Sequence, residues 1–161
     1  MPNKSLHKKN VRGDRYVIGI VKSSFNHIIT DGLLEGALRA LREAKVKEKN
    51  IAILEVPGSF ELPFGAKRLA LMKKFDAIVC LGAIIKGETR QDEYIASATA
   101  HGITRVGVET GVPTLFGVLS VPDMAKARER SGSGDNNRGY EAAQGAIALL
   151  ENMKNISFGG V

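Results

Sequence analysis

The stretch LGAIIKGETRQDEY (residues 81–94) contains an apolar strand, a turn with a glycine, and the first turn of a helix. In an open parallel sheet, ligands bind where strands end and helices begin, because backbone N–H groups and positive helix ends converge there. Lys86, Gly87 and Thr89 place a cation, an unhindered backbone and a hydroxyl at this point. The turn therefore suits a small phosphorylated ligand, although many α/β proteins have glycine and threonine in such turns for structural reasons alone.

Strand-like and helix-like segments alternate along the whole chain, and no hairpin signal joins two strands. The expected strands cover residues 15–23, 50–56, 77–85 and 113–120, and the expected helices cover 28–44, 63–73, 92–102, 124–130 and 139–153. Residues 105–109 suit a short strand or a bend, and Asp123 is the expected N-cap of the fourth helix. The pattern predicts an α/β protein: a single three-layer, flavodoxin-like sandwich with a four-stranded parallel sheet flanked by helices.

The length of 161 residues fits one domain with its own core. We expect this domain at 15–153, between a flexible basic tail at 1–14 and a flexible tail at 154–161. Apolar runs are far shorter than the ~20 residues that span a bilayer, and the start of the chain lacks the apolar core of a secretory signal. The expected location is cytoplasmic, with no membrane partner.

The net charge of +6 raises the question of nucleic-acid binding. Much of the excess lies in the basic tail and at Lys45, Lys47 and Lys49, where no aromatic residues alternate with the charges as in a stacking surface. We therefore expect no nucleic-acid partner. A single cysteine, Cys80, excludes an intrachain disulfide, and three scattered histidines offer no metal-binding cluster.

Two other expected strand ends carry residues that suit a ligand. Phe25 follows the first strand, where an aromatic ring either closes the core or forms a platform for a flat ligand. The second strand runs into a Pro-Gly turn followed by Ser59, Phe60 and Glu61. The Glu61 carboxylate suits either the positive end of the next helix or a hydrogen bond from a ring N–H of a ligand.

These motifs occur in the order Phe25-Asn26, VPGSFELP (56–63), GAIIKGET (82–89), GVPTLFGVLS (111–120) and Arg130…Arg138. In this order they resemble the 6,7-dimethyl-8-ribityllumazine synthase family over about residues 15–153. The resemblance implies a transferase for the penultimate step of riboflavin biosynthesis. This enzyme condenses 5-amino-6-ribitylaminouracil with 3,4-dihydroxy-2-butanone 4-phosphate, releases phosphate and water, and needs no cofactor or metal.

The resemblance also implies roles for individual residues. Those matched to binding of the two substrates are Phe25, Asn26, Ser59, Phe60, Glu61, Ile84, Ile85, Gly87, Glu88, Thr89 and Phe116. Phe116 matches an aromatic that a neighbouring subunit contributes, and Arg130 matches the arginine that pairs with the phosphate. Arg138 stands where the family usually has lysine, so charge is kept while the geometry differs. Together with Gln91, these two arginines form the expected catalytic set.

The turn departs from the family pattern at Gln91, which occupies the place of a histidine, and at Asp92, which occupies that of an aromatic. A histidine exchanges protons near neutral pH, whereas a glutamine amide only orients by hydrogen bonding. Asp92, His27 or the substrate phosphate could replace part of this function. Three interpretations therefore stay open: an active synthase with an altered proton-transfer residue, a weakly active or non-catalytic ligand-binding or shell-forming homologue, and a related enzyme resembling archaeal-type riboflavin synthase.

The family resemblance further implies a site shared between neighbours in a ring of five, so the expected assembly is a homopentamer. The short loop between Arg130 and Arg138 resembles that of shell-forming members, whereas the N-terminal segment lacks the apolar alternation of a strand added to a neighbour's sheet. A decamer and a sixty-subunit shell therefore stay open, as does riboflavin synthase as a protein partner.

Overall fold

A computed structural model of the chain describes residues 12–156 and residue 158. The strands are β1 (Ile18–Ser23), β2 (Ile51–Val56), β3 (Ala77–Ile85) and β4 (Thr114–Val121). The α-helices are α1 (His27–Glu43), α2 (Leu62–Leu71), α3 (Gln91–Thr110), α4 (Met124–Glu129) and α5 (Arg138–Lys154). Single turns of 3-10 helix form η2 (Gly13–Arg15), η3 (Glu48–Asn50) and η4 (Ser59–Glu61). Most of the two predicted tails, residues 1–11, 157 and 159–161, lies outside the described residues.

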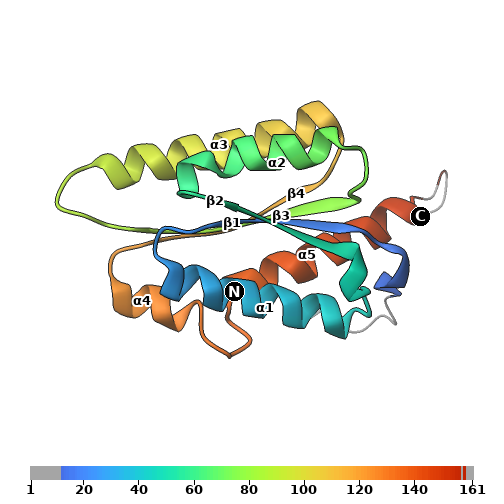
Figure 1. The fold of residues 1–161 in the computed structure, drawn as a ribbon, viewed down its shortest axis with the longest axis horizontal. Helices are drawn as coiled ribbons and strands as arrows, with labels where there is room; N and C mark the ends of the chain where they lie inside the picture. Colours follow the sequence, from blue (N-terminus) through green and yellow to red (C-terminus); the bar gives the residue numbers. More distant parts are fainter. Residues whose placement is uncertain (1–11, 157, 159–161) are drawn as a thin grey trace.

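The four strands form one parallel sheet in the order β2-β1-β3-β4. Helices α2 and α3 cover one face of this sheet, and α1, α4 and α5 cover the other (Figure 1). The predicted three-layer sandwich with four parallel strands is therefore confirmed.

Alternate residues of the central strands supply two separate cores. Ile20 and Leu81 belong to the core beneath α1 and α5, whereas Val21 and Cys80 belong to the core beneath α2 and α3. This is the alternation that a strand buried on both faces requires, because successive side chains point to opposite sides. Cys80 is fully buried, and burial raises the pKa of its thiol to about 12. The sheet thus forms a rigid support for the turns at its edge.

Helix α3 is longer than predicted. It continues to Thr110, so residues 105–109 are helical and the expected short strand or bend is wrong. Gly102, where we expected the helix to end, is instead a packing position: a Cβ there would lie 2.6 Å from Cγ of Pro63 on α2. The helix ends at Gly111, whose left-handed φ of 73° favours glycine. Asp123 is confirmed as an N-cap, since its carboxylate accepts a hydrogen bond from the Lys126 amide at 2.7 Å.

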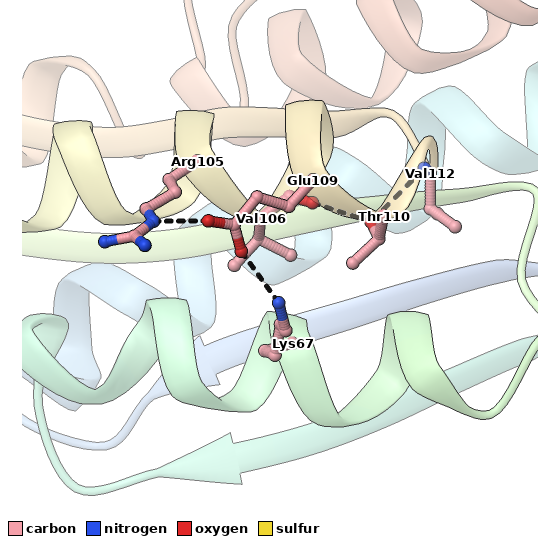
Figure 2. A network of polar contacts seen from close by, with 6 residues as sticks. All are labelled: Lys67, Arg105, Val106, Glu109, Thr110 and Val112. Atoms are coloured by element: carbon pink, nitrogen blue, oxygen red, sulfur yellow. Dashed lines mark hydrogen bonds and ion pairs between the residues drawn. The ribbon is translucent and has the colours of Figure 1, made fainter.

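Helices α2 and α3 are also joined by an ionic network on their outer side (Figure 2). The Glu109 carboxylate accepts a hydrogen bond of 2.9 Å from Lys67 on α2 and one of 2.5 Å from Arg105, one turn earlier on α3. These bonds, first from Lys67 and then from Arg105, lower the pKa of Glu109 to about 2. The network therefore favours the ionised carboxylate in the folded state.

We expect a Glu109→Gln variant to be slightly less stable than the parent, by roughly 1–3 °C in Tm at low ionic strength. Because the folded-state pKa lies below that of the unfolded chain, this contribution is complete above about pH 4.5 and is lost as the pH falls toward about 2. Thermal unfolding of both proteins between pH 7 and pH 3 measures it. Glu35→Gln, at an exposed carboxylate without an ion pair in the described part of the chain, is the control. A Tm difference that stays constant across this range would contradict the prediction.

Candidate functional site

A pocket of about 730 Å³ lies where β1, β2 and β3 end and α3 begins, beside the loop at the left of Figure 1. Ten of the residues predicted for the site line it: Phe25, Asn26, Ser59, Phe60, Glu61, Ile84, Ile85, Gly87, Thr89 and Gln91. Three loops far apart in the sequence thus contribute to one cavity, as the topology of a parallel sheet favours.

The turn between β1 and α1 forms the first wall of the pocket. Asn26 adopts a left-handed conformation (φ 58°), and its side-chain amide donates a hydrogen bond of 2.9 Å to the carbonyl of Ala83 on β3. The Phe25 amide donates to the Pro57 carbonyl at 3.0 Å, which fixes the backbone of this turn. The Phe25 side chain is 70% exposed, so it does not close the core. It is available as a platform for a flat ligand.

The 3-10 turn η4 forms the second wall. Ser59 is buried, and its carbonyl accepts a hydrogen bond of 3.1 Å from the Thr99 hydroxyl on α3. A Cβ at position 82 would lie only 2.6 Å from the Ser59 hydroxyl, so Gly82 permits this close approach to β3. The neighbouring Phe60 ring is 62% exposed. The backbone of the turn is therefore held against β3 and α3, while its side chains at 60 and 61 line the pocket.

The turn between β3 and α3 forms the third wall. Its start is fixed by a hydrogen bond of 3.0 Å from the Lys86 amide to the carbonyl of Val121 on β4. No heavy atom lies within 4 Å of a Cβ placed on Gly87, and the Gln91 amide donates to the Thr89 hydroxyl at 3.3 Å. The turn is exposed, so its backbone is open to a ligand, but Glu88 does not line the pocket.

Six further lining residues were missing from the predicted set: Gly58, Ala83, Asp92, Tyr94, Ile95 and Ala98. Tyr94, Ile95 and Ala98 on α3 continue the face that begins at Gln91, because residues three, four and seven positions further on share one side of a helix. This spacing could have identified them in the sequence. His27, by contrast, is exposed and does not line the pocket.

Phe116, Arg130 and Arg138 form a second group away from this pocket. Glu141 on α5 accepts hydrogen bonds from the guanidinium groups of Arg130 at 2.9 Å and Arg138 at 3.3 Å. Arg138 also donates to the carbonyl of Phe116 on β4 at 2.8 Å. The structure thus places the two arginines together, but it does not bring them into the pocket of the same chain.

The loop between the two arginines is closed at its base. The Arg138 amide donates a hydrogen bond of 2.8 Å to the Arg130 carbonyl. Asn137, which is 1% exposed, caps α5 by accepting from the Tyr140 amide and donates to the carbonyls of Gly32 and Gly132 at 2.9 and 2.8 Å. One buried side chain therefore ties the loop to α1 and α5 and fixes where Arg138 begins its helix.

The pocket combines an exposed aromatic ring, two carboxylates (Glu61 and Asp92) and an open backbone turn. No arginine or lysine lines it. Within residues 12–156 and 158, no three histidine, cysteine or acidic side chains come together as a metal site. None of the helices described here has the length and apolar character needed to cross a membrane.

A comparison with protein families matches most of the chain. The family model described as 6,7-dimethyl-8-ribityllumazine synthase matches residues 15–154, a range that contains every strand and α-helix from β1 to α5. The matched range also contains the whole pocket and the group formed by Phe116, Arg130 and Arg138. Because the match covers most of the sequence, this chain belongs to the 6,7-dimethyl-8-ribityllumazine synthase family, a transferase family of riboflavin biosynthesis.

Proposed function

We propose that the protein condenses 5-amino-6-ribitylaminouracil with 3,4-dihydroxy-2-butanone 4-phosphate to 6,7-dimethyl-8-ribityllumazine, releasing phosphate and water. The observation that supports this proposal most is the pocket itself. It collects an exposed ring at Phe25, a carboxylate at Glu61 and the backbone turn at Gly87 along one edge of the sheet. A flat heterocycle with a polyol chain and a phosphorylated ketone each have a matching surface there.

In this proposal, catalysis comes mainly from orientation of the two substrates. Phe25 stacks on the pyrimidine ring, while Glu61 and the η4 backbone bind the ribityl chain. The backbone of the β3–α3 turn faces the phosphorylated substrate. Holding an amine beside a ketone in this way removes much of the entropic cost of a bimolecular reaction, which is worth several kcal/mol of the barrier. No cofactor is needed, because imine formation, loss of phosphate and ring closure are additions and eliminations without net oxidation or reduction.

The pocket of one chain lacks a cation for the phosphate, whereas Arg130 and Arg138 lie together outside it. We therefore propose a homopentamer in which the Phe116–Arg130–Arg138 group of one chain completes the pocket of its neighbour. A head-to-tail contact of this kind closes into a ring when the rotation between neighbours fits. Assembly into decamers or shells, a riboflavin synthase partner and the cytoplasmic location stay predictions.

Turnover by the purified protein tests the proposed reaction. We expect lumazine absorbance to appear when both substrates are supplied, and a Gln91→His variant to be about tenfold faster or less, because orientation and charge stabilisation carry most of the rate. The absence of either substrate is the control. The proposal would be contradicted if the wild-type protein formed no lumazine from the two substrates and only the Gln91→His variant were active.

Gln91 also supports a second candidate function, that of a ligand-binding homologue with little turnover. Such a protein would keep the same pocket walls and would bind the lumazine without forming it. Titration of the product with the silent wild-type protein, followed by fluorescence, would then show binding. The two candidates therefore differ in turnover and not in affinity.

A further inference from the structure

We propose that Asp92 is the general acid–base residue of this site and performs the proton transfers that Gln91 cannot. The inference rests on the proposed function and names the residue that moves protons within the same pocket. General acid–base groups must reach the reacting atoms first and have suitable chemistry second.

Asp92 is the second residue of α3 and lines the pocket beside Gln91. It is partly buried. Its carboxylate makes no hydrogen bond or ion pair with any part of the chain that the structure describes. A carboxylate that faces a ligand cavity and has no protein partner is free to exchange a proton with the ligand.

The neighbouring acids are less suited to this role. Glu93 does not line the pocket, and Arg90 binds its carboxylate through two guanidinium nitrogens at 3.1 and 2.9 Å. Glu88 does not line the pocket either. Glu61 and Tyr94 are the other titratable side chains of the lining, and Glu61 belongs to η4, where the proposed function places the ribityl chain. Asp92 is thus the unpaired acid nearest to the position that a histidine occupies in the family.

An acidic residue in the first turn of a helix also interacts favourably with the helix dipole. That interaction would explain a carboxylate at position 92, yet it gives no reason for the residue to face a cavity. Glu93 supplies the same interaction from the same turn. A purely structural role predicts a change in stability alone, whereas the proposed role predicts a change in the pH dependence of turnover.

The step assigned to Asp92 follows formation of the protonated imine between the uracil amine and the butanone carbonyl carbon. The carboxylate takes the proton from the adjacent carbon, which carries the hydroxyl. The electrons of that C–H bond form an enamine, and the enamine then expels phosphate with the electrons of its C–O bond. Asp92 gives its proton to the departing phosphate and becomes a carboxylate again. The enol that remains moves its hydroxyl proton to the terminal carbon through solvent, giving the methyl ketone needed for ring closure.

The experiment compares the wild-type protein with Asp92→Asn, and uses Glu93→Gln as the matched control on the next residue. We expect Asp92→Asn to lower kcat about 10²-fold, to change KM for the uracil substrate less than threefold, and to abolish the acidic limb of the pH profile of kcat. Glu93→Gln should keep kcat within threefold and keep that limb. Asp92→Glu, which retains the carboxylate, should recover part of kcat together with the acidic limb.

Several results would overturn the assignment. One is an Asp92→Asn variant that turns over at the wild-type rate with an unchanged pH profile. Another is a loss of product binding equal to the loss of turnover, which would make Asp92 a binding residue. If Asp92→Asn fails to fold, the test uses Asp92→Glu, whose side chain is one methylene longer. A pH profile of kcat that is the same for Asp92→Glu and the wild type then contradicts the proposal. A wild-type protein without turnover would instead contradict the proposed function, and not only the role of Asp92.

Discussion

An Arg130→Ala variant is expected to lose about 10³-fold in kcat/KM, mainly through a higher KM for the phosphorylated substrate. A guanidinium that binds a phosphate in two places makes two charge-assisted hydrogen bonds, each worth roughly 1.5–3 kcal/mol. Arg130 is already oriented by Glu141 at 2.9 Å, so little side-chain entropy is lost when the phosphate binds. Steady-state kinetics with each substrate varied in turn measure the effect.

Two variants serve as controls for this result. Lys126→Ala removes a nearby exposed cation of α4 that pairs with Glu129, and it should leave kcat/KM within threefold. Arg130→Lys keeps the positive charge but loses the planar guanidinium group that binds a phosphate through two nitrogens. Its kcat/KM should therefore lie between those of the wild type and the alanine variant. Equal KM values for the phosphorylated substrate in the wild type and in Arg130→Ala would show that this arginine does not bind the phosphate.

Activity is also expected to return when two inactive variants are mixed. Glu61→Ala damages the pocket, and Arg130→Ala damages the group that the neighbouring chain is proposed to supply. Each variant alone should lose about 10²-fold or more. When the two are unfolded and refolded together at equal amounts, random head-to-tail rings should regain about one quarter of wild-type activity. A site works only where an intact pocket meets an intact arginine group, and one neighbour pair in about four meets this condition.

The matched control mixes two pocket variants, Glu61→Ala and Phe25→Ala, which damage the same half of the site. Neither partner supplies an intact pocket, so no activity should return. Different affinity tags on the two chains verify that mixed rings have formed. Mixed rings of Glu61→Ala and Arg130→Ala that stay inactive would mean that each chain completes its own site.

The succession of strands and helices along the chain could be predicted because its signals are local, and the alternation of the two indicated the layers. Apolar runs at β1 and β3 need burial on both faces, and Pro57-Gly58 and the N-cap Asp123 mark element ends. The end of α3 was predicted wrongly because Gly102 has two possible meanings. In the sequence it is typical of a helix end, whereas its actual role is a close contact with Pro63 on α2, far away along the chain.

The sequence could indicate that residues following different strands lie together, since a parallel sheet brings those turns to one edge. The sequence prediction left out Ile95 and Ala98, although their helical spacing from Gln91 places them on the same face of α3. It also gave no sign that Asn137 anchors the loop between the arginines, because its partners at Gly32 and Gly132 depend on the tertiary fold. Residues positioned by packing between distant elements are those that sequence patterns reveal least.

The closed base of the loop between Arg130 and Arg138 makes this loop a natural place for added peptide. Its exposed residues, 132–136, lie beyond the hydrogen bond that joins the Arg138 amide to the Arg130 carbonyl. Extra sequence placed between Ser133 and Gly134 would lengthen the tip without separating the two guanidinium groups. In the proposed ring each chain carries one such tip, so an epitope or targeting peptide grafted there would be displayed in five copies. The same feature that holds Arg130 and Arg138 next to each other thus makes the protein a candidate scaffold for multivalent display.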